Sequence, residues 1–217
     1  ETAVAGDLLL EATAAGNLRE RRMTLESQAS LADFSAANEL ADLLAGSRPT
    51  AGLKLALEPD GVLRIREASV TTPEIKVTAT GSIALEEKVV DFQSRMEMAD
   101  LTRLGKALGR DLGGDFHLSA LLRGQLDRPE VAMKAAVNRL QIDDLDPFDI
   151  RAGLVSSPRG EHLVGKGEVK ITQGDRVMDI GADFFLGKER LQLKKISARG
   201  LDVKVAGELA MDTKTLL

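Results

Sequence analysis

The chain of 217 residues contains no tryptophan, no tyrosine and no cysteine, and its six phenylalanines are its only aromatic residues. Tryptophan and tyrosine are the usual large anchors of protein-binding surfaces, and aromatic rings stack on the bases of single-stranded nucleic acid. Their scarcity argues against both kinds of interface. The lack of cysteine excludes disulfide scaffolds and thiolate chemistry, and it leaves the cellular compartment open.

Clustered positive charge and long apolar runs are also missing. The net charge is −5 and the 29 lysines and arginines are scattered, so we expect no nucleic-acid partner. No apolar run approaches the ~20 residues of a transmembrane helix, and no signal peptide is recognisable. The sequence begins at Glu1 without an initiator methionine and ends at Leu217 just after a strand-like run. We therefore expect a piece cut from a longer polypeptide.

Residue patterns that carry chemistry are scarce. His117 and His162 lie far apart in the sequence, without metal-ligand spacing around either. Asp143, Asp144 and Asp146 form the one notable acidic cluster. It could bind Ca²⁺, but it lacks the glycine and terminal glutamate of an EF-hand loop, which favours a solvated turn. Phosphate-binding loops, dinucleotide fingerprints and nucleophile elbows are absent. We expect no enzyme, no cofactor and no metal site.

What the sequence does contain is a period of two. Apolar and polar residues alternate in run after run, which predicts strands with one apolar and one polar face. We count about 13 such strands and expect a mainly-β fold, a long antiparallel sheet that curls into an open, solenoid-like groove. The apolar residues expected to line this groove are Leu53, Leu55, Leu57, Ile75, Val77, Ile83, Leu85, Phe92, Met96, Met98, Phe116, Leu118, Leu122, Val131, Met133, Val137, Phe148, Ile150, Leu154, Met178, Ile180, Phe184, Leu186, Leu201, Val203 and Val205.

Turn and helix signals interrupt the alternation. Tight turns or hairpin loops are predicted at 59–61, 86–88, 158–160, 173–175 and 187–189. Apolar residues at helical spacing predict two short helices, at 34–45 and 101–109.

Two kinds of repetition are visible. An Ala-Asp pair precedes each predicted helix, at Ala32 and again at Ala99, which indicates repeat units of about 1–98 and 99–217 within one domain. A shorter phrase, glycine followed by a polar, an apolar, a variable and an apolar residue, begins at Gly6, Gly81 and Gly207. We expect each of these glycines to mark a bend or bulge where a strand restarts.

Several segments resemble the repeating phrase of the TamB family, within the AsmA-like superfamily. In that phrase an Ala-Asp-Leu helix is followed by a glycine-opened strand and then by a Gly-x-Leu-x-x-Pro-x-Val crossing. Residues 99–104 (ADLTRL) and 113–131 (GGDFHLSALLRGQLDRPEV) look like it, as do 77–85 (VTATGSIAL) and 203–209 (VKVAGEL). The resemblance touches most of the chain.

The resemblance implies a segment of a large periplasmic protein of Gram-negative bacteria, anchored in the inner membrane by a helix outside this chain. Such a protein works with a TamA-like outer-membrane partner. The family is linked to the assembly of autotransporters and other outer-membrane proteins and to phospholipid transport between the membranes. The family fold is a long sheet curled around an apolar groove.

Three functions remain open. The groove could carry phospholipid acyl chains, and at ~0.8 kcal/mol per buried methylene a 16-carbon chain would gain on the order of 13 kcal/mol. The groove or the sheet edges could instead receive unfolded outer-membrane β-strands. The chain could also be a plain structural β-solenoid or adhesin-type repeat with a filled core. If acyl chains are carried, aspartate or arginine at Ile83 or Phe184 should block their crosslinking.

Overall fold

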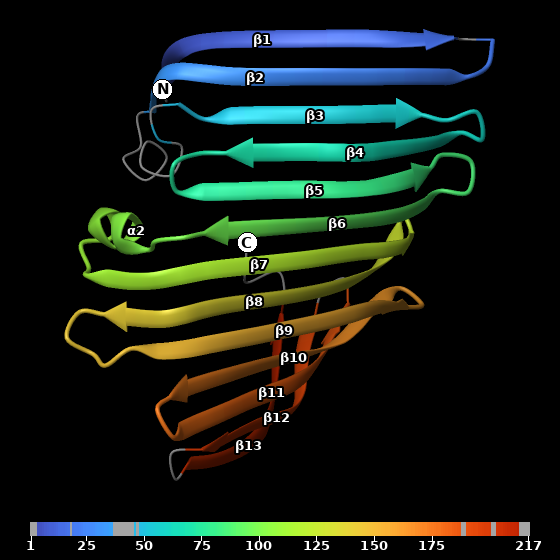
Figure 1. Ribbon diagram of the computed structural model, residues 1–217. Helices are drawn as coiled ribbons and strands as arrows, with labels where there is room; N and C mark the ends of the chain where they lie inside the picture. Colours follow the sequence, from blue (N-terminus) through green and yellow to red (C-terminus); the bar gives the residue numbers. More distant parts are fainter. Residues whose placement is uncertain are drawn as a thin grey trace.

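The described residues form one antiparallel sheet of 13 strands, so the predicted mainly-β fold and the strand number are confirmed (Figure 1). The computed structural model describes residues 4–17, 19–36, 46, 48–187, 190–200 and 203–212. Spatial order follows chain order, from β1 at one edge to β13 at the other. The strands are β1 (Val4–Asn17), β2 (Arg22–Ala36), β3 (Thr50–Leu57), β4 (Val62–Thr71), β5 (Ile75–Ala84), β6 (Val89–Met98), β7 (Leu112–Gln125), β8 (Arg128–Ile142), β9 (Phe148–Arg159), β10 (His162–Gln173), β11 (Arg176–Leu186), β12 (Arg190–Gly200) and β13 (Val203–Asp212).

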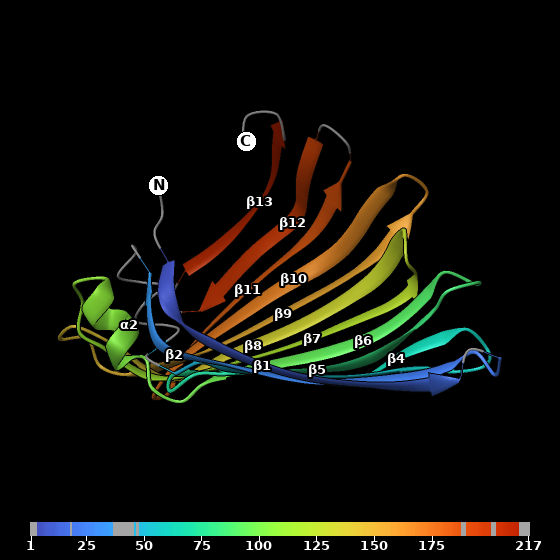
Figure 2. The ribbon, with the colours of Figure 1, turned by 90° about the horizontal axis from the view of Figure 1, so that it is seen from above.

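The sheet is strongly twisted and stays open. Seen from above, the strand direction rotates steadily from β1 to β13, and the last strands rise away from the plane of the first (Figure 2). Each adjacent pair is rotated in the same sense because L-amino acids give strands a fixed hand of twist. β1 and β13 do not pair with each other, so both remain edge strands of the described sheet.

Within the range 101–109, where a helix is predicted, the structure has the six-residue helix α2 (Thr102–Ala107) between β6 and β7. The Asp100 carboxylate begins it by accepting hydrogen bonds from the backbone N–H and the hydroxyl of Thr102, at 2.8 and 2.6 Å. These bonds lower the pKa of Asp100, because they favour its charged form. Leu101 is buried beside the helix, which contacts β7.

The helix predicted at 34–45 is wrong at its start. Residues 34–36 are the end of β2, where Ser35 and Ala36 pair with the first residues of β1. Pairing with the neighbouring strand therefore outweighs the helical spacing of the leucines there. Residues 37–45 lie outside the described residues.

The turns predicted at 59–61 and 86–88 are confirmed, and the turn within 173–175 lies at 174–175. The prediction at 158–160 is wrong in position. Pro158 and Arg159 belong to β9 and pair with Leu163 and His162, so the chain reverses at Gly160 and the residue after it. Gly160 has φ +64°, which suits a two-residue hairpin turn. Of the predicted loop 187–189, only Gly187 is described, and it follows β11.

Bulges occur in four strands of the described sheet, in β2 around Asp33 and in three further strands. β4, β8 and β12 each carry an irregularity, around Arg66, Arg139 and Lys195. The predicted glycines relate to bulges in two ways. Gly6 lies at a register shift itself, with φ +147°, whereas Gly81 and Gly207 pair next to the bulges of β4 and β12. The glycine therefore often faces the bulge of the neighbouring strand.

Two glycines within strands are covered by phenylalanine rings. Gly81 pairs with Phe92 and Gly165 pairs with Phe184. A Cβ added at Gly165 would lie 2.2 Å from the carbonyl oxygen of Val155 and 2.5 Å from Cζ of Phe184. The absence of a side chain therefore allows the ring to lie directly on the backbone of the next strand.

We expect Gly165→Ala to destabilise the fold by about 1–3 kcal/mol, because the new methyl group meets fixed backbone. Gly167→Ala is the matched control: Gly167 lies two residues along the same face of β10, and an added Cβ meets nothing within 4 Å. Urea unfolding of both variants measures the difference. Equal midpoints for the two variants would contradict this packing.

Candidate functional site

The strand register gathers the apolar side chains on one face of the sheet. Residues directly opposite each other in an antiparallel pair point to the same side, so a row of paired residues shares a face. One such row crosses seven strands and is apolar throughout: Ile75, Met98, Phe116, Val137, Ile150, Ile171 and Met178. We call this side of the sheet the apolar face and the opposite side the polar face.

Nearly all of the predicted lining residues lie on the apolar face. These are Leu53, Leu55, Leu57, Ile75, Val77, Ile83, Phe92, Met96, Met98, Phe116, Leu118, Leu122, Val131, Met133, Val137, Phe148, Ile150, Leu154, Met178, Ile180, Phe184, Leu186 and Val205. Leu85 lies in the turn after β5 and is exposed. Val203 begins β13, but its side chain is not described, and Leu201 lies outside the described residues.

The same face continues over strands that the lining prediction left out. Leu8 and Leu10 extend it over β1, Leu63 over β4, Val169 over β10 and Leu193 over β12. In β1 the sequence does not show the alternation, because Leu9, between Leu8 and Leu10, is apolar although it lies on the polar face. In β10 it is hidden because Gly165 and Gly167 occupy apolar-face positions.

No second layer covers the sheet among the described residues. Each strand contacts its neighbours in the sheet. The helix α2 packs mainly against β7. The accessible surface is 14779 Å² for a 23.2 kDa chain, against about 9700 Å² for a compact monomer of this mass. In the described part only Ala56, Val90, Met98 and Leu101 are buried apolar residues. The fold therefore lacks the closed core of a compact domain.

The polar face carries a hollow of about 1300 Å³ over β6 to β12, which we call the polar hollow. The residues that line the hollow show on which face of the sheet it opens. Lys166 contributes without its apolar-face neighbours Gly165 and Gly167, and on β12 Ser197 and Arg199 contribute without residues 196 and 198. Met96, Leu118, Met133, Leu154 and Ile180 of the apolar face also border it, but each lies between two lining neighbours of the polar face on the same strand, so the hollow opens on the polar side of the sheet. Its floor includes small residues such as Ala132 and Gly153.

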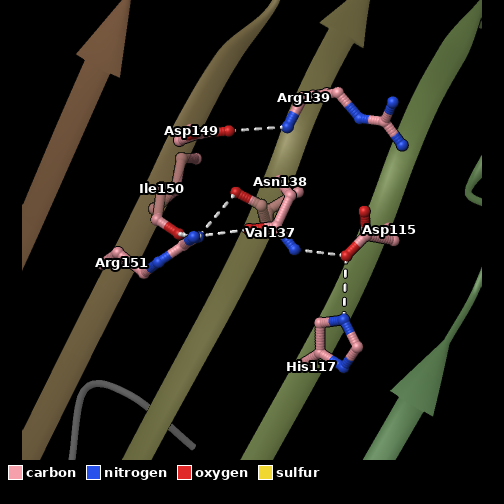
Figure 3. A network of polar contacts seen from close by, with 8 residues as sticks. All are labelled: Asp115, His117, Val137, Asn138, Arg139, Asp149, Ile150 and Arg151. Carbon is pink, nitrogen blue, oxygen red and sulfur yellow. Dashed lines mark hydrogen bonds and ion pairs between the residues drawn. The ribbon is translucent and has the colours of Figure 1, made fainter.

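A polar network beside this hollow joins β7, β8 and β9 (Figure 3). The Arg151 guanidinium donates to the Asn138 side-chain oxygen at 2.5 Å and to the carbonyl of Val137 at 3.3 Å. The Asn138 amide donates in turn to the Asp115 carboxylate, which also lies 2.9 Å from Nε2 of His117. Arg151 is thereby held in one orientation on the polar face.

The bulge in β8 is held next to this network. The Asp149 carboxylate accepts a hydrogen bond of 2.7 Å from the backbone N–H of Arg139, which has φ +49° (Figure 3). A carboxylate from the neighbouring strand thus satisfies a donor that the bulge takes out of the ladder.

Both histidines have neighbours that account for them. His117 pairs with Asp115, and His162 packs on Phe185 with ring centroids 4.5 Å apart. Asp115, His117 and Ser119 share the polar face of β7 in the order of an acid, a base and a nucleophile. No hydrogen bond joins His117 to Ser119 in the described part of the chain, and the hydrogen-bonding partner of His117 is Asp115.

The acidic cluster is used as a structural clasp. The Asp143 carboxylate accepts hydrogen bonds from the backbone N–H of Asp111, at 3.1 Å, and from the Arg110 guanidinium, at 2.8 Å. These two contacts lower the pKa of Asp143. Since the charged form is the bonded one, the clasp is present at neutral pH and is lost only as pH falls through this lowered pKa. Among the described residues, no group of three potential ligands could hold a metal ion.

Exposed ion pairs decorate the rest of the polar face. Lys54 lies 3.3 Å from Glu26 and 3.2 Å from Glu67, across β2, β3 and β4, and these partners raise its pKa. Lys195 at the bulge of β12 lies 2.9 Å from Asp183, which raises the pKa of Lys195. These charges keep the polar face hydrated, in contrast to the aliphatic apolar face.

Within the described residues, no helix is long and apolar enough to span a bilayer. Comparison with known proteins gives no match, whether to family models, to curated proteins or to solved structures. Function is therefore inferred from the two faces of the sheet.

Proposed function

We propose that this chain is a lipid-contacting segment of a TamB-like envelope protein, and that its apolar face carries phospholipid acyl chains between the inner and outer membranes. The observation that carries the proposal is the continuous apolar face of the 13-stranded sheet, which no other element covers among the described residues. Apolar patches of more than a few hundred Å² on a soluble protein mark a surface that binds something. The proposed role is binding and not catalysis.

The chemistry of the apolar face favours acyl chains over an aromatic-anchored protein partner. Its side chains are mainly those of leucine, isoleucine, valine, methionine, alanine and a few phenylalanines, with serines at 27, 94 and 156 and without tryptophan or tyrosine. Acyl chains need no directional contact, and a uniform aliphatic surface lets them slide. A 16-carbon chain lying on one open face is half buried and gains about 6 kcal/mol, at ~0.8 kcal/mol per fully buried methylene. Curling of this face into a groove, as in the TamB fold, would roughly double that gain.

The wider setting follows from the resemblance to the TamB family. We place the chain in the periplasm of a Gram-negative bacterium, as part of a protein anchored in the inner membrane through a segment outside this chain. A TamA-like outer-membrane protein is the proposed partner of that longer protein, and outer-membrane proteins and autotransporters are its proposed assembly clients.

A second candidate role uses the edge of the sheet. Within the described sheet β1 is the edge strand, with 14 residues and without proline or lysine, and Leu8 and Leu10 are 68% and 62% exposed. Long apolar edge strands without such protection readily accept another strand. An unfolded outer-membrane β-strand could add there by β-augmentation, and it would extend both faces of the sheet.

The structural alternative is a β-solenoid or adhesin-type repeat with a filled core. That architecture needs a second layer over the apolar face, and no element supplies one in the described part of the chain. The experiment that separates the readings is photo-crosslinking of acyl chains from each face of one strand. Crosslinks from the apolar face alone support acyl-chain transport, whereas a filled core gives none.

A further inference from the structure

The polar hollow has a charge balance opposite to that of the chain. Seven lysine and arginine side chains line it against four aspartates and glutamates, whereas the whole chain has a net charge of −5. A concave surface with a surplus of one charge concentrates the field and attracts ions of the other sign.

Two of these seven basic residues already have partners. Lys195 pairs with Asp183 at 2.9 Å, and Arg151 is held by Asn138 and by backbone carbonyls. The side chains of the other five form no ion pair or hydrogen bond with the described residues: Arg95, Lys134, Lys166, Lys170 and Arg199.

The strand register separates these five into two groups. Lys170 and Arg199 both lie directly across from Asp179, and Lys166 lies across from Asp183. Arg95 and Lys134 have no acid directly across from them. Arg95 faces Thr78 and Ser119, and Lys134 faces Ser119 and Gly153.

We propose that the polar hollow binds a phosphorylated ligand, whose phosphate group lies over Ser119 between Arg95 and Lys134. Neighbouring Cβ atoms in a row are about 5 Å apart, so those of Arg95 and Lys134 flank Ser119 at a span of about 10 Å. Both long side chains can converge over the serine. Arginine offers a two-pronged donor for phosphate oxygens, lysine a mobile positive charge and serine a hydroxyl donor.

The size of the hollow indicates what the phosphate is attached to. At about 1300 Å³ it exceeds the usual range of small-ligand pockets, about 300–1,000 Å³. The Glu168 side chain lies over Gly153, so Ala132 is the small residue that leaves space over the floor next to Lys134, and the exposed Val155 offers an apolar contact. A phosphate ester with a bulky organic part fits this arrangement better than inorganic phosphate.

The test is isothermal titration of the whole chain with tripolyphosphate, and with phosphatidylcholine vesicles that do or do not contain phosphatidic acid. The double variant with Arg95→Gln and Lys134→Gln should raise the Kd of the probe that binds the native chain at least tenfold. Lys54→Gln with Arg64→Gln is the matched control. It removes the same charge from residues outside the polar hollow that already pair with Glu26, Glu67 and Glu58, and it should change the Kd less than twofold.

The outcomes separate the sources of the phosphate. Binding of tripolyphosphate supports a soluble phosphorylated ligand, and binding only to vesicles with phosphatidic acid supports a lipid headgroup. If the Arg95 and Lys134 variant does not fold by circular dichroism, Ala132→Asp places a carboxylate in the same hollow and should cause the same loss. No binding of any probe by the native chain, or equal weakening in both double variants, overturns the proposal. Because this site lies on the polar face, its failure leaves the proposed function of the apolar face unaffected.

Discussion

Replacing Met133 with aspartate is expected to weaken acyl-chain binding about 60- to 300-fold. Met133 lies on the apolar face of β8, in a row with Ala120 and Leu154, and is 36% exposed. A carboxylate in the middle of an apolar contact costs about 2.5–3.5 kcal/mol on membrane-insertion scales, and each 1.4 kcal/mol is a factor of ten in affinity. Titration with a fluorescent fatty acid measures the change.

The matched control for this variant is Ala132→Asp. Ala132 precedes Met133 on the same strand and points to the polar face, so the same charge is added on the other side of the sheet. Acyl-chain binding should stay within about twofold of the native value. Phosphate binding should respond in the opposite way, because the side chain at position 132 points to the polar face and the side chain at position 133 to the apolar face. Equal loss of acyl-chain binding in both variants would show that folding, and not the face, is being measured.

Amphiphiles are expected to stabilise the folded chain. A ligand that binds only the folded state adds about 2.7 kcal/mol of stability at one hundred times its Kd. For a chain of this size that corresponds to a rise in Tm of about 5–10 °C. The physical reason is the surplus of exposed surface, 14779 Å² against about 9700 Å² for a compact monomer. Thermal unfolding by circular dichroism, with and without a non-ionic detergent, measures the shift.

Met133→Asp serves here as the control, because it should lose most of this rise while keeping the sheet. For a β-solenoid with a filled core the expected result differs. Its apolar side chains are already out of water, so detergent should leave Tm unchanged or lower it. An unchanged Tm in the native chain would therefore count against an open apolar face.

The sequence predicted the fold well where polar residues mark every second position. In β11, Met178, Ile180 and Phe184 share one parity and Asp179 and Asp183 the other, so the alternation can be seen without the structure. β1 was harder, because Leu8, Leu9 and Leu10 are consecutive and only pairing with β2 shows which two share the apolar face. The end of β2 was missed because leucines at helical spacing follow it.

The polar hollow could not be predicted from the sequence. Arg95, Ser119 and Lys134 come from three different strands, and only the register brings them into one row. Register depends on the bulges as well as on the strands, since each extra residue shifts the pairing beyond it. The glycine phrases indicated the positions of bulges only in part. Gly81 and Gly207 lie next to bulges of the neighbouring strands, and not at bulges of the strands that contain them.

The most direct test of the apolar face uses two adjacent leucines of β7. Leu122 pairs with Phe92 and Val131 on the apolar face, and Leu121 pairs with Gln93 and Ala132 on the polar face. A photoreactive benzoylphenylalanine is placed at one or the other position, and the protein is irradiated with phospholipid and analysed by mass spectrometry. We predict acyl-chain adducts from position 122 and few or none from position 121. Equal adducts from both positions, or none from position 122, would contradict acyl-chain binding by the apolar face.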